Sequence, residues 1–174
     1  GVAPTQAQQK EFASALALSA DLPMLGRPVT FGFAGDSIAA MWAKYEGDSP
    51  LALALYENYP CNVVRLFSSA QGGSSSSTLI SSQIGTLEAL AVKPDIVVIQ
   101  SLQNDFMNST SSADGFFANI TQYATRALAA GVKQLWICSR PPKSETAAGV
   151  PDAITYINRR IQEFCRSTPG CVYI

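Results

Sequence analysis

The chain has 174 residues, and 47% of them are hydrophobic, which predicts a single domain with a sizeable core. The 12 Lys and Arg residues balance 13 Asp and Glu residues, so the chain has no excess of basic residues to bind nucleic-acid phosphates. Histidine is absent, which excludes His-based metal sites and a complete Ser-His-Asp triad within these residues. We therefore expect no metal ion and no nucleic-acid partner.

The polar surface is poor in charge. Charged residues make up 14% of the chain, against about 25% in ordinary soluble proteins. No apolar run reaches the length of roughly 18 residues that a membrane span needs, so no membrane partner is expected. This composition favours an extracellular, periplasmic or virion-associated location.

The four cysteines show no metal-binding spacing. Cys138 lies in an apolar run and is predicted to be a buried small hydrophobe. Cys165 and Cys171 flank a Ser-Thr-Pro-Gly turn, where either a short disulfide loop or two free thiols can form.

The predicted elements begin with a helix at 6–18, and residues 1–28 form an N-terminal lead-in to a domain at 29–174. Within that domain, apolar β-runs alternate with helices. This alternation predicts an α/β fold, three-layered and flavodoxin-like, with a five-stranded parallel sheet. The predicted strands are 29–34, 62–66, 96–100, 134–138 and 172–174, and the predicted helices are 38–45, 50–56, 76–90, 116–130 and 151–166.

Ligands of such sheets bind at the carboxyl ends of the strands. The first strand leads into Gly35-Asp36-Ser37-Ile38 and then a helix. A serine on this turn exposes its hydroxyl and places its backbone N–H at the start of a helix, where that N–H can stabilise an oxyanion. An ordinary helix cap is the alternative interpretation.

Three further strand ends carry candidate residues. Gly72 and Gly73 follow the second strand and would let a backbone N–H approach a ligand closely, or would simply form a flexible turn. Asn104 and Asp105 follow the third strand, where an amide could donate to an oxyanion or both residues could serve the turn. Arg140, after the fourth strand, could meet an anionic substrate, although a solvated or salt-bridged role is favoured.

In this order, the three segments after the first three strands resemble the SGNH (GDSL-type) hydrolase family over residues 29–174. The resemblance implies that Ser37 is the nucleophile. It also implies an oxyanion hole formed by the Ser37 N–H, the Gly73 N–H and the Asn104 amide, with Gly72 as the rival second donor. Asp36 and Asp105 would support the loops.

The chain departs from the family pattern at two places. Leu102 stands where the third motif has glycine, so the loop could take a different path. The Asp-x-x-His motif that supplies the base is missing, and Asp152 does not replace it because it opens a helix before the last strand. A domain truncated at its C-terminus and a pseudoenzyme are the two explanations, and the last predicted strand at the end of the chain favours truncation.

By this resemblance, the function is that of a secreted serine esterase or acetylesterase without a cofactor, hydrolysing small acyl esters. O-acetyl groups on carbohydrate are the first choice of substrate. A non-catalytic carbohydrate- or partner-binding module is the alternative, and a nucleotide or flavin binder is a third hypothesis that no phosphate-binding loop supports. The oligomeric state is left open.

Overall fold

The computed structural model describes residues 29–43, 65–100, 102–105, 109–141 and 150–174. The predicted helices at 6–18 and 50–56, the start of the second strand at 62–64 and the lead-in at 1–28 lie outside the described residues. Within the described residues strands and helices alternate along the chain, in the predicted order.

Five strands of the described residues form one sheet, in which every neighbouring pair is parallel. Their order across the sheet is β2-β1-β3-β4-β5, the order of flavodoxin-like folds. The predicted α/β fold with five parallel strands is therefore confirmed. The strands are β1 (Thr30–Gly35), β2 (Arg65–Ser68), β3 (Ile96–Gln100), β4 (Gln134–Ile137) and β5 (Cys171–Tyr173).

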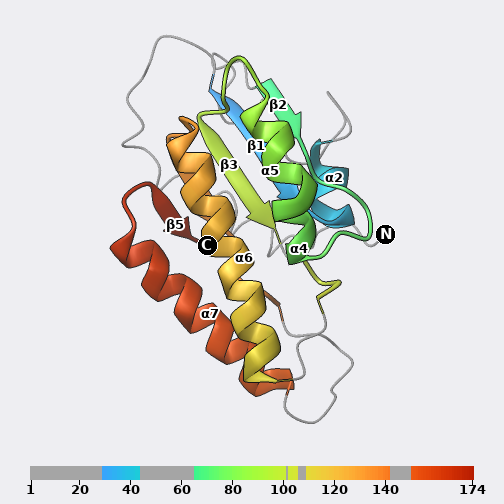
Figure 1. Ribbon diagram of the computed structural model, residues 1–174, viewed down its shortest axis with the longest axis vertical. Coiled ribbons are helices and arrows are strands. Elements are labelled where there is room, and N and C mark those ends of the chain that lie inside the picture. Colours follow the sequence, from blue (N-terminus) through green and yellow to red (C-terminus); the bar gives the residue numbers. More distant parts are fainter. Residues whose placement is uncertain (1–28, 44–64, 101, 106–108, 142–149) are drawn as a thin grey trace, which may run out of the picture.

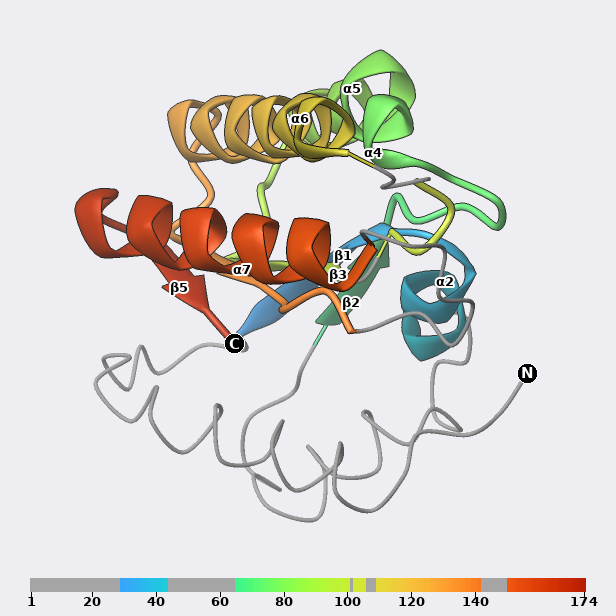
Figure 2. The ribbon, with the colours of Figure 1, turned by 90° about the horizontal axis from the view of Figure 1, so that it is seen from below.

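The helices lie on both faces of this sheet (Figures 1 and 2). One face carries α4 (Ser76–Thr78), a π-helical segment η1 (Leu79–Gln83), α5 (Ile84–Glu88), α6 (Thr110–Ala129) and α7 (Val150–Ser167). The short helix α2 (Ser37–Ala43) follows β1 and lies on the opposite face. The connection from β1 to β2 crosses the sheet in the opposite direction from the connections that lead to β3, β4 and β5. Because such parallel connections are right-handed, α2 lies on the face opposite the other helices.

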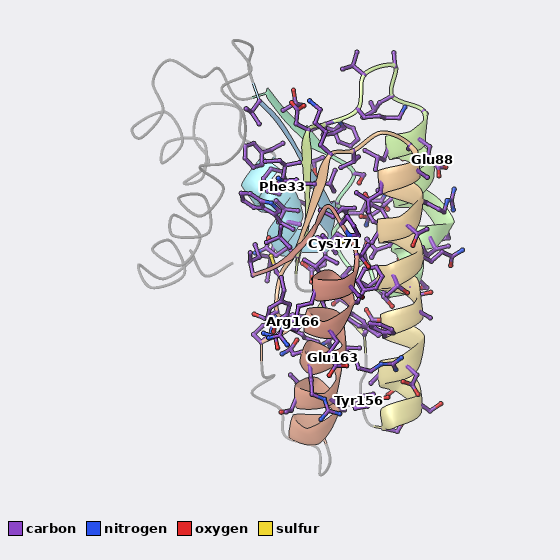
Figure 3. The ribbon with its side chains drawn as sticks, turned by 90° about the vertical axis from the view of Figure 1, so that its left-hand side faces the viewer. Phe33, Glu88, Tyr156, Glu163, Arg166 and Cys171 are labelled. Carbon is purple, nitrogen blue, oxygen red and sulfur yellow. The ribbon has the colours of Figure 1, made fainter. Side chains whose placement is uncertain are left out.

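Both faces of the central strands are buried, which explains their continuous apolar sequences. Alternate side chains of β3, Val97 and Ile99, join a core cluster with residues of α6 and α7. On the other face, Phe31 and Trp136 meet edge to face with ring centroids 5.8 Å apart. Figure 3 shows Phe33 on this second face, away from α6 and α7.

No disulfide joins the cysteines of the last helix and strand. Cys165 and Cys171 are free thiols in the structure, so the disulfide alternative is not formed. A hydrogen bond between them raises the pKa of Cys165 and lowers that of Cys171. Cys138 is part-exposed rather than buried as predicted, although burial of its thiol raises its pKa to about 12.

Candidate active site

The turn after β1 places a buried carboxylate next to an exposed hydroxyl. Gly35 has a φ of +141°, and a Cβ at this position would lie 2.5 Å from the Gln100 carbonyl oxygen, so only glycine fits. The chain then turns into α2, with Asp36 buried and Ser37 exposed as the first residue of the helix. The hydroxyl and the backbone N–H of Ser37 are thus presented at the carboxyl end of β1.

Asp36 connects this turn to the loop after β3. Its Oδ1 accepts a hydrogen bond from the Ile38 N–H at 3.0 Å, and its Oδ2 accepts one from the Gln103 N–H at 2.9 Å. Charge-assisted bonds of this kind are about twice as strong as neutral ones. Asp36 therefore holds two loops together and faces away from solvent.

The glycine turn after β2 lies beside Ser37. A Cβ at Gly72 would be 3.9 Å from the Ser37 Cβ, and Gly73 has a φ of +79° with open space around its own Cβ position. The Ser74 N–H donates to the Gln71 carbonyl at 3.2 Å, which closes the turn. A positive φ at the third residue is what a type II turn requires. Both glycines are exposed, so their backbone groups are accessible at the site.

The loop after β3 reaches the same place. Asn104 is exposed, and its Nδ2 donates to the Ser74 carbonyl oxygen at 2.9 Å. An asparagine amide carries two N–H groups, and the Ser74 carbonyl accepts one of them. Leu102 has a φ of +44°, so it adopts the left-handed conformation that glycine favours. The departure from glycine at this position therefore leaves a left-handed backbone in place.

Asp105 points away from the exposed groups. Its two oxygens accept hydrogen bonds from the N–H and the hydroxyl of Ser76, both at 2.6 Å. The Ser76 hydroxyl also accepts a bond from Asn119 Nδ2 at 3.0 Å. Asp105 thereby ties the loop after β3 to the start of α4 and to α6.

Arg140 has a role that the sequence did not indicate. It is 4% exposed, and its guanidinium donates to the Leu102 carbonyl at 2.7 Å and to the Asp105 carbonyl at 2.6 Å. The same group lies 5.2 Å from the centroid of the Phe116 ring, and burial lowers its pKa. The prediction of a solvated role for Arg140 is therefore wrong, because its side chain is buried and its guanidinium donates to backbone carbonyls.

Gln83 is a second polar residue that the sequence analysis missed. It is fully buried and bonds to the backbone of Gly35 and to the Ser74 hydroxyl. Its sequence signal is an amide among the apolar residues of the helix predicted at 76–90. A buried amide needs hydrogen-bond partners, and here they belong to two loops of the site.

These contacts join the three predicted segments. Ser37 lies beside Gly72, Asn104 bonds to the residue after Gly73, and Asp36 bonds to the loop that carries Asn104. The place is the switch point between β1 and β3, where ligands of flavodoxin-like folds bind. An exposed hydroxyl, exposed backbone N–H groups and an amide suit an ester carbonyl whose oxygen becomes negative.

A histidine base and a metal-binding cluster are both lacking within the residues that the structure describes. The 174 residues include no histidine. Among the described residues, no group of three or more His, Cys, Asp or Glu side chains could hold a metal ion.

The family model described as GDSL-like Lipase/Acylhydrolase matches residues 31–170. That span covers most of the chain, including all three segments of the site. The chain belongs to this family. By this membership the protein resembles carboxylic ester hydrolases. A sequence comparison with curated proteins found no match.

Solved structures similar to this GDSL-like chain include three hydrolases. The esterase EstA from Pseudoalteromonas sp., in a structure inhibited by monoethylphosphonate, has a TM-score of 0.59 and 18% identity over 83% of this chain and 76% of its own. A catalytic mutant of Axe2, an acetylxylan esterase from Geobacillus stearothermophilus, has a TM-score of 0.60 and 14% identity over 85% and 76%. LAE5, an alpha/beta hydrolase enzyme from the metagenome of Lake Arreo, has a TM-score of 0.58 and 16% identity over 85% and 77%. At these identities the likeness shows the fold.

The part of this GDSL-like chain that the structure describes includes no helix that is long and apolar enough to cross a membrane.

Proposed function

We propose that the protein is a serine esterase in which Ser37 attacks the carbonyl carbon of a small acyl ester. The observation that carries the proposal is the meeting of three loops, with Gly72 against Ser37 and the Asn104 amide on Ser74. The Ser37 N–H, the Gly73 N–H and the Asn104 amide then stabilise the oxyanion. Removing one such donor typically costs about 2.7–4 kcal/mol of transition-state stabilisation.

The chemistry needs a base, because a serine hydroxyl is a weak nucleophile near neutral pH. The 174 residues hold no histidine, so we assign the base to a histidine of an Asp-x-x-His motif outside them. The Ser37 proton passes to this imidazole as Oγ bonds to the acyl carbon, and then to the departing alkoxide. Water, deprotonated by the same imidazole, then attacks the acyl carbon of the acyl-serine. The carboxylic acid leaves, and the Ser37 hydroxyl is restored.

The substrate that we propose is an O-acetyl ester, with carbohydrate as the alcohol. The sequence around the site supports this, because Gln71 precedes the glycine turn and Gln103 precedes Asn104, and neutral amides suit sugar hydroxyls. A structural neighbour that is an acetylxylan esterase supports the same choice. The low charged fraction of 14% supports an extracellular, periplasmic or virion-associated setting.

Hydrolysis of p-nitrophenyl acetate tests the proposal. The 174-residue chain should turn over feebly, because the oxyanion donors alone leave a rate of roughly 10³–10⁴ over water in triad hydrolases. A version extended through an Asp-x-x-His motif should gain several orders of magnitude. Ser37→Ala should abolish this gain, and Asn104→Ala should reduce kcat by about 100-fold or more. Unchanged activity in Ser37→Ala would refute the nucleophile assignment.

The absence of histidine also favours a second candidate, a non-catalytic module that binds acetylated sugars. Calorimetric titration with acetylated xylo-oligosaccharides distinguishes the binding module from the esterase. Binding without release of acetate by the full-length gene product would establish the module and exclude the esterase.

A further inference from the structure

Gln83 links the turn that carries Ser37 to the glycine turn. Its amide oxygen accepts a hydrogen bond from the Gly35 N–H at 2.9 Å, and its nitrogen donates to the Gly35 carbonyl at 2.8 Å. The nitrogen also donates to the Ser74 hydroxyl at 3.2 Å. Both amide N–H groups are used, so this fully buried side chain has satisfied donors.

Gly35 depends on this contact for its own backbone. At the end of β1 the chain bends at a φ of +141°, and Gly35 uses both its N–H and its carbonyl on Gln83. The same carbonyl accepts the Gln71 N–H at 3.2 Å, from the first residue of the glycine turn. The residue two positions before Ser37 is therefore fixed by one side chain and one neighbouring loop.

Gln83 lies in the π-helical segment η1, at its last residue. The Ile84 N–H bonds to the Leu79 carbonyl, five residues earlier, which widens the turn. Gln83 and the next residue, Ile84, are both fully buried. Such widened turns occur frequently at functional sites.

We propose that Gln83 is a positioning residue for ester hydrolysis, which fixes the glycine turn relative to Ser37 and so sets where the oxyanion donors lie. The proposal rests on the function proposed above. Gln83 acts through Gly35 and Ser74 and does not touch the substrate. A displacement of about 1 Å in such a site can cost about 100-fold in rate, so the effect should appear in kcat.

The first test compares Gln83→Met with a matched control in the full-length gene product. Gln134 is suited as the control, because it also accepts a side-chain hydrogen bond, from Trp136 at 3.0 Å, but lies at the amino end of β4. Gln83→Met should lower kcat on p-nitrophenyl acetate by about 100-fold while KM changes little, and Gln134→Met should keep the parent kcat. A Gln83→Met protein that melts earlier but retains the parent kcat would overturn the proposal.

The variant Gln83→Glu provides a second test, the pH dependence of kcat, which a loss of stability alone would not change. A neutral carboxyl can accept from the Gly35 N–H and donate to the Gly35 carbonyl or the Ser74 hydroxyl, whereas a carboxylate has no proton to donate. Burial raises the pKa of a carboxyl group, so the introduced group should change state near neutral pH. The kcat of Gln83→Glu relative to the parent should therefore fall as pH rises, with circular dichroism showing a folded protein throughout. A ratio that is flat with pH would overturn the proposal.

Two controls separate this proposal from the proposed function. If Ser37→Ala retains the parent rate, the nucleophile is wrong, whatever the Gln83 variants do. If Ser37→Ala is inactive and Gln83→Met is fully active, only the role of Gln83 is wrong. Amide NMR of the 174-residue chain adds a measurement without turnover: Gln83→Met should shift the Gly73 and Ser74 resonances and speed hydrogen exchange at Gly35, and unchanged signals there would refute the coupling.

Discussion

Leu102 holds a left-handed backbone with a φ of +44° at the entrance of the loop that carries Asn104. This conformation costs an L-residue about 1–2 kcal/mol. The side chain is 1% exposed and belongs to the core cluster, and Arg140 binds the Leu102 carbonyl. Burial and the buried guanidinium together offset the backbone strain.

Two substitutions at this position should reverse the usual order of stability. Leu102→Ala and Leu102→Gly both lose the buried side chain, but only glycine relieves the strained backbone. Ordinarily glycine is about 0.5–1 kcal/mol worse than alanine. Here chemical denaturation should show Leu102→Gly to be more stable than Leu102→Ala by about 1 kcal/mol. The opposite order would mean that φ is negative at this residue.

Asp36→Asn should weaken the hydrogen bonds through which this carboxylate connects the turn after β1 to the loop after β3. The carboxylate accepts backbone N–H groups from Ile38 and Gln103, whereas an asparagine presents only one oxygen and turns its NH₂ group toward the other donor. We expect a loss of about 1–3 kcal/mol in unfolding free energy and a lower kcat, because the Asn104 amide moves. Denaturation and ester hydrolysis measure the two effects. Asp114→Asn, at an exposed carboxylate of α6, should leave kcat unchanged.

At the scale of elements, Arg140 couples the end of β4 to the loop after β3. Its guanidinium bonds to carbonyls of that loop, and its backbone N–H and carbonyl pair with the side chain of Asn158 in α7 at 2.8 and 2.9 Å. One residue thus connects a strand end, a helix and the loop that carries Asn104.

Arg140→Lys should be severely destabilising although it keeps the charge. A lysine ammonium is a compact charge, and it cannot replace the planar guanidinium that donates to both the Leu102 and the Asp105 carbonyls. Because the group is buried, we expect a loss of about 3 kcal/mol or more in unfolding free energy, measured by denaturation. Arg166→Lys, exposed in the last turn of α7, should be neutral. A neutral Arg140→Lys would show that the guanidinium bonds contribute little.

Strands were easier to predict from this sequence than helix details. The apolar run at 96–100 predicted the bounds of β3 correctly, because a strand that is buried on both faces has a continuous run of apolar residues. The start of α6 was missed by six residues: it begins at Thr110, where the side chain of Ser109 caps it through the Ser112 N–H, and polar residues followed by glycine resemble a loop. The π-helical segment, whose last residue Gln83 bonds to Gly35 of β1, was missed as well.

For the whole molecule, the sheet order explains why motifs far apart in sequence meet. β1 lies between β2 and β3, so the loops after these three strands share one edge of the sheet. Local patterns could therefore indicate the candidate residues Ser37, Gly73 and Asn104. They could not indicate the hydrogen-bond partners of Arg140 or Gln83, because contacts of a buried polar group depend on which distant backbone atoms lack partners.

The stability of the whole molecule should fall at alkaline pH through Cys138. Its thiol ionises around pH 9.0 in the unfolded chain, but burial raises its pKa to about 12 in the folded protein. Between these values the unfolded state binds fewer protons, so the free energy of unfolding falls as pH rises, whereas the contribution is complete below pH 9.0. Denaturation across this range should give a shallower decline for Cys138→Ala. An equal decline would exclude this thiol as a cause.

The contact between Asn119 and Ser76 has a consequence for production of the protein. Asn119 begins an Asn-Ile-Thr acceptor for N-linked glycans, and its Nδ2, the atom that would carry the sugar, donates to the Ser76 hydroxyl at 3.0 Å. A glycan added during eukaryotic secretion, before folding, would replace the bond from Asn119 to Ser76, the residue that also bonds to Asp105 in the loop that carries Asn104. Protein secreted by yeast should therefore hydrolyse esters more slowly than protein made in bacteria. Thr121→Ala, which removes this acceptor pattern and leaves the one at Asn108-Ser109-Thr110, should raise the activity of the yeast product.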